Sequence, residues 1–377
     1  MILLKSNNIS CGYDLFRNCI FGFIILLMRH LFYFIFLFTI KLVISQENPP
    51  NIILMIGDGM GLTQISSGMY ANGNKTALEN FDYIGLSKTH ALENLVTDSA
   101  ASGTAMACGV KTYNGVIGID GKNKTYPSIL ELTKEKGYSS TLIATSSIVH
   151  ATPASFYAKV ISRDMYEKIA FQLSQHDIDI FIGGGKKHFI NRKDERNLIS
   201  EMTEYEFVNS IEEFKNSTSK KIGFLTYDDE PPSLLEGRKP ALDDLVSVSL
   251  KKMASKDRPF FMLVEGSQID WGGHDRNLNY VISEFKEFNK SIQTVLDFAK
   301  THGNTLVIVT ADHETGGLAI LKGSLKNSKV RGRFTTNHHS ATMVPVFSYG
   351  PYSKLFAGIY ENTAIFEKMN QALLEKK

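Results

Sequence analysis

The chain alternates short apolar runs with longer amphipathic segments. Six apolar runs, rich in Ile, Val, Leu and Phe, lie at residues 51–56, 140–144, 178–182, 260–264, 305–310 and 344–348. Several are apolar throughout, which is typical of strands buried on both faces of a parallel sheet. Helical patterns lie between them, at 126–137, 166–175, 241–255 and 281–302. The alternation predicts an α/β fold, a three-layer α/β/α sandwich around a large, mostly parallel sheet.

Two polar stretches interrupt this pattern, at residues 209–229 and 322–336, and the second is rich in Gly, Lys and Arg. We expect both to be surface excursions outside the sheet. The chain has 377 residues, of which 43% are hydrophobic and 21% charged. This is enough to bury the core of one large domain or two smaller ones.

The N-terminal segment has the layout of a secretory signal peptide. From Met28 the chain runs MRHLFYFIFLFTIKLVISQ: a short basic start, an apolar stretch, then small and polar residues. This predicts export, to the periplasm or out of the cell, with cleavage near Ser45 or Gln46. The apolar run FGFIILL upstream leaves two alternatives open. Either translation begins at Met28, or residues 20–45 remain as an uncleaved membrane anchor.

Charge and cysteine content narrow the class of protein. The net charge is +2, but residues 1–45 hold four basic residues and one acidic residue, which leaves 37 basic and 38 acidic residues in the remainder. This balance provides no basic field for nucleic-acid-specific binding. Only Cys108 of the three cysteines lies beyond the predicted signal segment. We therefore expect no disulfide in the mature chain, and Cys108 as a buried packing residue.

Polar segments follow four of the predicted strands. IGDGMG follows the first, HATP lies beyond the second, EGSQIDWGGH follows the run FFMLV, and ADHETGG follows the run TLVIV. In an open α/β sheet the active site lies at the carboxyl ends of the strands. We therefore expect these four segments to meet at one edge of the sheet.

The acidic and imidazole side chains of these segments predict metal binding. Asp270 and His274 are four residues apart, so they face one ligand position if their turn is helical. Asp312 and His313 are adjacent at a strand end, and a histidine pair at 338–339 precedes the last predicted strand. One such histidine alone is more often structural, but a mixed set of carboxylate and imidazole groups favours Zn²⁺ over Mg²⁺.

A second set offers only oxygen ligands. Asp58, Thr152 and Glu265 come from three different strand ends. Together they suit a hard cation such as Mg²⁺. Taken singly, Asp58 is equally explained as a turn aspartate, and Thr152 as a turn or cap residue before Pro153.

Ser99 is the candidate nucleophile. It begins the segment SAASGTAMACG, whose small residues predict a tightly packed helix. A serine at a helix N-terminus is commonly an N-cap. Alternatively, the helix N-terminus receives an anion there, and a nearby metal lowers the pKa of the hydroxyl without a histidine base. Arg163 could hold two phosphate oxygens, although a lone arginine more often forms a surface ion pair.

Six segments, in this order, resemble the alkaline phosphatase family. They are IGDGMG (56–61), TDSAASGTA (97–105), HATPASFYA (150–158), VEGSQIDWGGH (264–274), TADHETGG (310–317) and the histidine before VPVFSYGP. The resemblance implies an alkaline phosphatase-like sandwich with a short crown insertion. Residues 1–45 would be the signal peptide or anchor and residues 46–377 the catalytic domain. The activity implied is hydrolysis of phosphate monoesters to alcohol and inorganic phosphate through a phosphoserine on Ser99.

The resemblance also implies two zinc ions and one magnesium ion in a single cleft. The ligands implied are carboxylate, imidazole and hydroxyl groups: Asp270, His274 and His339 for the first zinc; Asp58, Asp312, His313 and Ser99 for the second; Asp58, Thr152 and Glu265 for magnesium. His339 is preferred over His338 because its distance from VPVF matches the family. Arg163, held in place by Asp98, would bind the phosphate.

Two positions depart from one branch of the family. His150 and Trp271 stand where other members carry an aspartate and a lysine, near the magnesium and the phosphate. We expect these changes to alter magnesium affinity and phosphate release, with His150 able to favour a different metal at the third site. The segment between His313 and His339 is short where members often insert a crown subdomain used in dimer contacts. The resemblance therefore implies a compact enzyme that forms a homodimer.

Two other functions fit parts of the pattern. One is phosphodiester or sulfate-ester hydrolysis on the same fold, and the other is an exported phosphate- or metal-binding protein without turnover. Arg163 and the oxygen ligands favour the monoesterase, and the sequence lacks the Cys or Ser modification motif that a sulfatase needs. A complete set of nucleophile, arginine and metal ligands favours an enzyme over a binding protein.

Overall fold

The structure is a computed structural model that describes residues 17, 19, 21–34 and 49–374. Pro49–Leu374 forms one compact unit, and the residues before it belong to a second unit. In that second unit residues 21–34 are helical. Among the described residues, no helix combines the length and apolar character needed to cross a membrane. The predicted cleavage position near Ser45 and Gln46 lies outside the described residues.

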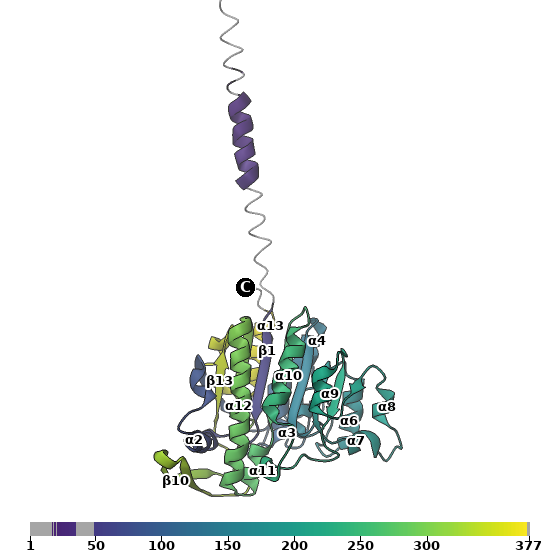
Figure 1. Cartoon of the computed structure of the whole chain (residues 1–377), viewed down its shortest axis with the longest axis vertical. Helices are drawn as coiled ribbons and strands as arrows, with labels where there is room; N and C mark the ends of the chain where they lie inside the picture. Colours follow the sequence, from purple (N-terminus) through teal and green to yellow (C-terminus); the bar gives the residue numbers. More distant parts are fainter. Residues whose placement is uncertain (1–16, 18, 20, 35–48, 375–377) are drawn as a thin grey trace, which may run out of the picture. The chain divides into compact units, whose positions relative to one another are not determined.

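A ten-stranded sheet forms the centre of the unit Pro49–Leu374, in the order β14-β2-β13-β8-β1-β7-β3-β4-β6-β5 (Figure 1). The strands are β1 (Asn51–Gly57), β2 (Tyr83–Lys88), β3 (Ser139–Ser147), β4 (Ile180–Gly184), β5 (Glu206–Phe207), β6 (Ile222–Leu225), β7 (Phe260–Gly266), β8 (Thr305–Thr310), β13 (Val344–Tyr349) and β14 (Gly358–Glu361). Strand β13 runs antiparallel to both of its neighbours, and all other pairs are parallel. The predicted mostly parallel sheet is therefore confirmed.

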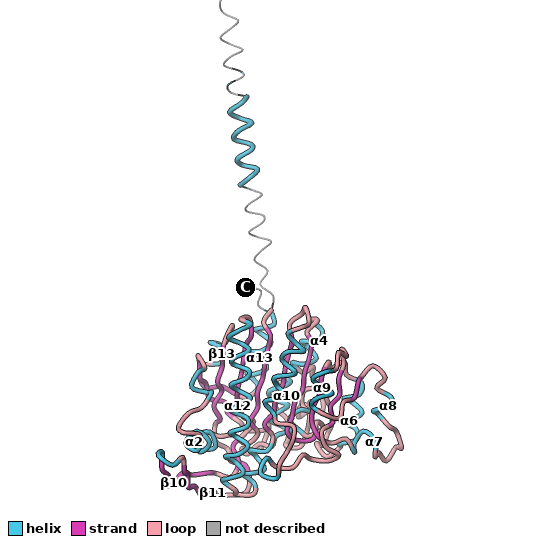
Figure 2. The backbone as a smooth tube through the Cα atoms, viewed as in Figure 1, coloured by secondary structure: helices cyan, strands magenta, loops and turns pink. Residues whose placement is uncertain are grey.

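Helices cover both faces of the sheet, because the side chains of each central strand alternate between two cores. In β1, Ile52 and Leu54 point into one core and Ile53 and Met55 into the other. Figure 2 shows the strands as a layer between helices. The first core is closed by helices that include α3 (Ser99–Cys108), α4 (Ile129–Glu135), α6 (Tyr166–Gln175) and α13 (Thr363–Leu374). The second is closed by helices that include α2 (Leu62–Ala71), α10 (Leu242–Ala254) and α12 (Leu278–His302).

The predicted elements agree with the observed ones to within a few residues at most ends, with one exception in the polar stretches. Residues 209–229 are not a surface excursion, because they contain β6, which lies between β4 and β5 in the central sheet. All four residues of β6 are buried. Strand β6 is only an Ile-Gly-Phe-Leu run between polar flanks, and so short a run gives little periodic signal.

The second polar stretch is a surface hairpin, as predicted. Strands β10 (Leu318–Ser324) and β11 (Lys329–Phe334) form a separate two-stranded antiparallel sheet. The hairpin lies between β9 (Glu314–Thr315) and β12 (His339–Ser340), which pair with each other. This hairpin is the short insertion expected between His313 and His339, and it begins and ends beside candidate metal ligands.

Candidate active site

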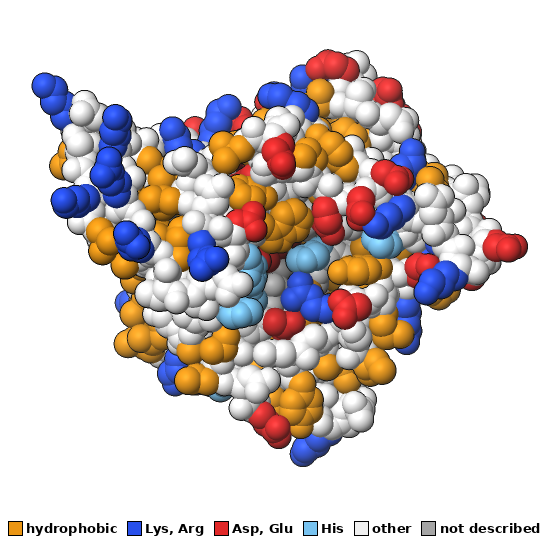
Figure 3. Space-filling model, turned by 90° about the horizontal axis from the view of Figure 1, so that it is seen from below, with side chains coloured by type: hydrophobic (Ala, Val, Ile, Leu, Met, Phe, Trp, Pro, Cys, Tyr) orange, Lys and Arg blue, Asp and Glu red, His pale blue; other side chains and the backbone are white. Residues whose placement is uncertain are grey.

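The polar segments meet at one edge of the sheet, as the order of strands and motifs predicts. Asp58 directly follows β1, Glu265 lies near the end of β7, and Asp312 and His313 follow β8. His339 lies in the short strand β12, just before β13, and it reaches the same edge because β13 is antiparallel to β8. The remaining residues lie on helices: Ser99 on α3, Thr152 on α5 (Ala151–Ala154), and Asp270 and His274 on α11 (Gln268–His274). Figure 3 shows His side chains around a hollow in this face.

Three groups of ligand atoms are close enough to hold metal ions. Within each group the ligand atoms lie within 4.8 Å of one another: Asp270, His274 and His339; Asp58, Asp270 and His313; Asp58, His150 and Glu265. The first group has the composition expected for the first zinc. In the second, Asp270 joins Asp58 and His313, while Asp312 Oδ2 lies 3.1 Å from His313 Nε2. The third contains the imidazole of His150, so it is not an all-oxygen set.

Unpaired buried oxygens show that these groups fit cations. Both carboxylate oxygens of Asp58 and Oε1 of Glu265 are buried, and none has a hydrogen-bond partner among the described residues. A buried carboxylate without a partner is strongly destabilising, and a bound cation removes that cost. The donor set of carboxylates and imidazoles suits zinc, and the carboxylate-rich part suits magnesium.

The pKa values at the site follow from the same crowding of acids. Burial raises the pKa of Asp58 well above its ordinary value, and the charges of Asp312, Asp270 and Glu265 raise it further. Burial, with a smaller contribution from Asp312, raises the pKa of Glu265 to about 8. A cation that binds between these two carboxylates must therefore displace protons near neutral pH.

This displacement predicts that metal affinity at the third group rises with pH. Below the Glu265 pKa of about 8, the ligand is protonated in the metal-free protein, so affinity for Mg²⁺ should fall by up to about tenfold per pH unit for each proton displaced. Mg²⁺ titrations of the metal-free protein between pH 6.5 and 9.5 measure this. An affinity that stays constant across that range would contradict the assignment of Glu265 as a ligand.

Backbone carbonyls orient two of the imidazole rings. The Nδ1 atom of His274 lies 2.7 Å from the carbonyl oxygen of Asn337, and Nδ1 of His339 lies 2.8 Å from that of Thr97. A carbonyl only accepts, so each Nδ1 carries a proton, and Nε2 is the ring nitrogen that faces the metal group. The two Nε2 atoms are 3.1 Å apart. His339, and not the exposed His338, is the histidine of the pair that enters the site.

Thr315 is a site residue that the sequence analysis missed. Its hydroxyl donates a short hydrogen bond to Asp270 Oδ1, and it also lies 3.2 Å from Nδ1 of His313. Thr315 therefore holds one carboxylate and one imidazole of the second metal group. A threonine next to ADHE has no distinctive spacing, so only the tertiary structure reveals this contact.

We expect Thr315→Val to weaken metal binding by about 10- to 100-fold, because the buried hydroxyl that orients two ligands is lost while the shape is kept. Metal content after dialysis against a graded chelator series measures the effect. Thr315→Ser, which retains the hydroxyl, should restore metal retention. Equal metal retention in the Val variant and the unaltered protein would show that the hydroxyl orients nothing.

Ser99 is not the N-cap of α3. Asp98 has that position, and its Oδ1 accepts a hydrogen bond of 2.9 Å from the backbone N–H of Ala101. The Ser99 hydroxyl is thereby free of capping, and its Oγ lies 3.4 Å from His313 Nε2 at the second metal group. This geometry removes the structural explanation of the serine and leaves the nucleophile explanation.

Arg163 lies between Asp98 and His150. Its guanidinium donates to Asp98 Oδ2 over 3.1 Å, and its other terminal nitrogen lies 3.2 Å from His150 Nε2. Burial, followed by the charge of Arg163, lowers the pKa of His150 to about 3, so the imidazole is neutral and accepts. Trp271 packs edge-on against His150. The lone arginine is thus anchored beside the third metal group.

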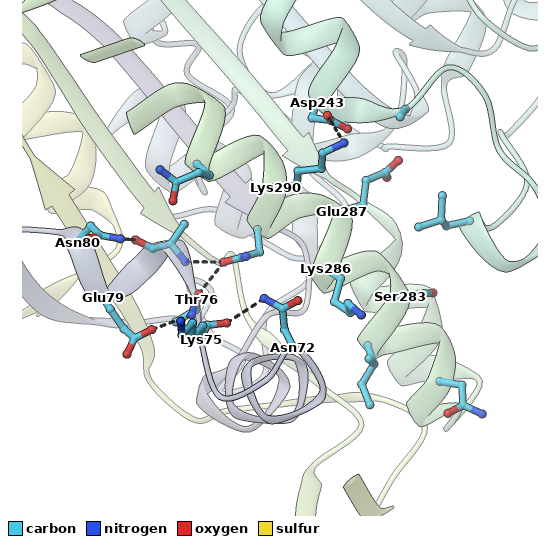
Figure 4. A pocket seen from close by; sticks show the side chains of 17 residues that line it. Asn72, Lys75, Thr76, Glu79, Asn80, Asp243, Ser283, Lys286, Glu287 and Lys290 are labelled. Carbon is cyan, nitrogen blue, oxygen red and sulfur yellow. Dashed lines mark hydrogen bonds and ion pairs between the residues drawn. The ribbon is translucent and has the colours of Figure 1, made fainter. Parts of the chain in front are cut away.

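An open pocket elsewhere lacks this chemistry. It has a volume of about 1050 Å³ and lies between the 3₁₀ helix η1 (Ala77–Asn80) and α12 (Figure 4). None of the candidate site residues lines it. Its lysine Lys290 forms an ion pair with Asp243 at 2.7 Å. The convergence of buried ligands, which this pocket lacks, therefore locates the site.

Comparisons with known proteins agree with this geometry. The sequence profile of the family described as alkaline phosphatase matches residues 50–330. Alkaline phosphatase 3 of Bacillus subtilis is 33% identical over 87% of this chain and 90% of its own length. The alkaline phosphatase of the Antarctic bacterium TAB5 is 40% identical, covers 87% of this chain and 98% of that one, and superposes with a TM-score of 0.81. A His-to-Asp variant of the TAB5 enzyme, 39% identical with the same coverage and TM-score, has Mg bound in its M3 site.

The profile match includes every segment that carries a candidate metal ligand except the one at His339. The chain therefore belongs to the alkaline phosphatase family and is a phosphomonoester hydrolase.

Proposed function

We propose that this chain hydrolyses phosphate monoesters in two displacements through a phosphoserine on Ser99. The observation that carries the proposal is the position of the Ser99 hydroxyl. Asp98, rather than Ser99, caps α3, so the Ser99 hydroxyl is not used for capping. Its Oγ lies 3.4 Å from Nε2 of His313, a histidine of the second metal group. A hydroxyl is a poor nucleophile unless its pKa is lowered. The buried ligands around Ser99 fit metal ions, and such ions would lower the pKa of its hydroxyl.

The chain's own residues would hold the ions and the substrate. Zinc ions at the first two groups and magnesium at the third would supply positive charge for the phosphoryl oxygens and lower the pKa of the Ser99 hydroxyl. Asp58 belongs to two groups and would bridge two cations. Arg163, oriented by Asp98, would donate to two phosphate oxygens and neutralise their charge.

The reaction would then proceed at phosphorus. Ser99 Oγ gives up its proton and attacks, the ester oxygen leaves from the opposite side and takes up a proton to give the alcohol, and the phosphoryl group is transferred to the serine. Water attacks the phosphoserine in the second step, releasing inorganic phosphate and restoring the hydroxyl. Since the phosphoryl group keeps its negative charge throughout, catalysis comes mainly from positioned positive charge rather than from proton transfer.

The third group is proposed to select its ion through His150. An imidazole beside Asp58 and Glu265 makes the site softer than three oxygens would, which favours Zn²⁺ relative to Mg²⁺. The TAB5 variant, in which an aspartate replaces a histidine and Mg is bound in the M3 site, supports this direction. Competition between Zn²⁺ and Mg²⁺ in the unaltered protein and in His150→Asp would test it, with Mg²⁺ gaining in the variant.

Export and self-association complete the proposal. The signal-peptide layout of the N-terminal segment supports export to the periplasm or beyond, with residues 46–377 as the catalytic domain. The family resemblance supports a homodimer. N-terminal sequencing of the secreted protein and light scattering of the purified protein test these two points independently of activity.

The activity itself is tested by comparing substrates with and without chelator. We expect the purified protein to hydrolyse p-nitrophenyl phosphate much faster than bis(p-nitrophenyl) phosphate. Exhaustive chelation should abolish turnover, and restored zinc and magnesium should recover it. Faster hydrolysis of the diester would favour a phosphodiesterase, and metal-independent hydrolysis would overturn the proposed site.

A further inference from the structure

The β10–β11 hairpin carries an unusual concentration of unpaired positive charge. Its five basic residues are all exposed: Lys322, Lys326, Lys329, Arg331 and Arg333. No acidic residue lies between Leu318 and Asn337. None of the five forms an ion pair or a side-chain hydrogen bond with another described residue. Many basic side chains elsewhere in the unit do so, for example Lys88 with Glu361 at 2.9 Å. Figure 3 shows Lys and Arg side chains gathered on one projecting corner of the face that holds the site.

The strand register brings two of these charges directly opposite each other. Lys322 pairs across the ladder with Arg331. Like charges at directly opposed positions destabilise a hairpin, so this pairing costs stability in the isolated protein. A negatively charged partner lying along the ribbon would turn the same arrangement into an attraction.

The hairpin also presents leucines to solvent beside these charges. The register shifts between Ile320 and Lys322, so Leu321 is the extra residue of a β-bulge and is turned out of the strand alternation. Leu321 is 59% exposed, and Leu325, at the start of the 3₁₀ tip Leu325–Asn327, is 64% exposed. The opposite side of the ribbon, at Val330 and Phe334, is partly buried against the protein. On the outer side, the two leucines are therefore exposed beside charged side chains that have no ion-pair partner among the described residues.

We propose that the β10–β11 hairpin docks the enzyme on anionic lipid membranes. Lysines and arginines next to exposed leucines are the combination that binds the interface of a negatively charged bilayer, since the cations meet lipid headgroups while the leucines enter the apolar boundary. A dissolved polyanion would use the charges but leave Leu321 and Leu325 exposed to water. A second copy of the chain packed hairpin to hairpin about a two-fold axis would bring like charges together.

Docking by the hairpin would also hold the site close to the membrane. The hairpin begins after Thr315 and ends before His339, so it is connected on both sides to segments of the metal groups. Phosphomonoester groups displayed on an anionic bilayer would then be the substrates presented at highest local concentration. This consequence rests on the proposed function, whereas the docking itself does not.

Vesicle binding tests the inference. The full protein is sedimented with vesicles of neutral phosphatidylcholine and with vesicles that contain phosphatidylglycerol, at low and high salt. We expect binding only to the anionic vesicles, weakened by salt. The double variant Lys322→Gln with Arg331→Gln should lower the partition coefficient roughly 30-fold, at about fivefold for each cation near an anionic surface. Leu321→Ser with Leu325→Ser should weaken binding at high salt, where the apolar contribution dominates.

A matched control removes the same charge from the opposite edge of the sheet. Lys220 and Lys300 are exposed and lie before β6 and β8, at the amino ends of the strands. Lys220→Gln with Lys300→Gln should leave vesicle binding unchanged. Hydrolysis of p-nitrophenyl phosphate in solution should be equal in all variants, so a failure of docking is distinguished from a failure of the catalytic proposal.

Four results would overturn the inference. The first is that the unaltered protein shows no preference for anionic vesicles, and the second is that the hairpin and control variants bind them equally. A change in oligomeric state in the hairpin variants, measured by light scattering, would instead identify the hairpin as a contact between copies. The fourth result comes from competition between dissolved polyphosphate and the anionic vesicles. If polyphosphate displaces the unaltered protein and the double variant Leu321→Ser with Leu325→Ser from the vesicles equally well, charge alone is recognised.

Discussion

Replacing Ser99 by alanine is expected to lower kcat/KM for p-nitrophenyl phosphate by at least about 10³-fold, because a two-step displacement cannot begin without its nucleophile. The fold should tolerate the change, since alanine favours a helix and the capping of α3 depends on Asp98. Steady-state kinetics of the purified, metal-loaded variant measure the loss, and its thermal midpoint should remain close to that of the unaltered protein.

A serine of another helix provides the control for this substitution. The Ser66 side chain on α2 is half-buried and donates a hydrogen bond to the carbonyl of Leu62 in its own helix. Ser66→Ala should therefore keep full activity. When the reaction with a phosphomonoester labelled in its phosphoryl group is quenched with acid, the unaltered protein should carry the label and Ser99→Ala should not. Activity within tenfold of the unaltered protein in Ser99→Ala would end the phosphoserine proposal.

Asp58→Asn is expected to have the second large effect. The substitution should be harmful when metal is bound and should stabilise the protein when metal is absent. Asp58 belongs to two of the three ligand groups, so a neutral amide should weaken retention of the ions of both groups by about 10²-fold or more and remove most activity. In the metal-free protein the same change removes a buried carboxylate whose pKa is raised by burial and by three neighbouring acids. The variant should then be more stable than the unaltered protein by about 1–3 kcal/mol.

The pH dependence of that difference follows from the direction of the pKa shift. A carboxyl group whose pKa is raised on folding binds more protons in the folded state, so its contribution to stability is present at low pH and is lost as pH rises through the folded value. The stabilising effect of Asp58→Asn without metal should therefore grow from acidic to alkaline pH. Thermal unfolding with chelator and with added zinc and magnesium measures both signs.

An exposed aspartate serves as the control for charge removal. Asp257 lies at the surface before β7. Asp257→Asn should leave metal content, activity and the metal-free stability unchanged. If Asp58→Asn destabilised the metal-free protein instead, repulsion between buried negative charges would not be the main contribution of Asp58 to its stability.

The elements around the site were largely predictable because their signals are local. The apolar runs of β1, β7 and β8 are long enough to identify buried strands, and the acids that follow them could be placed at one edge by the rule for parallel sheets. The four-residue spacing of Asp270 and His274 likewise predicted a shared ligand position, which the helix α11 provides. Strand β6 escaped prediction because four apolar residues between polar flanks lack a period.

The grouping of the ligands was less predictable, because it depends on distances between segments that are far apart in the chain. The resemblance implied the second group without Asp270 and the third without His150, yet folding brings ligand atoms of Asp270 near Asp58 and His313, and ligand atoms of His150 near Asp58 and Glu265. The orienting contacts of Thr315, Asn337 and Thr97 also leave no pattern in the sequence. A hydroxyl or a carbonyl becomes an orienting group only through the neighbour that folding gives it.

By itself the sequence determined the fold class, the family and the residue types of the site, because hydrophobic period and ordered motifs are properties of short segments. The tertiary structure alone decided that Asp98 rather than Ser99 caps α3, that the antiparallel β13 delivers His339 to the common edge, and that the hairpin between the metal groups opposes Lys322 to Arg331. These outcomes depend on strand direction, register and side-chain distance. Such quantities arise only when segments distant in the chain are packed together.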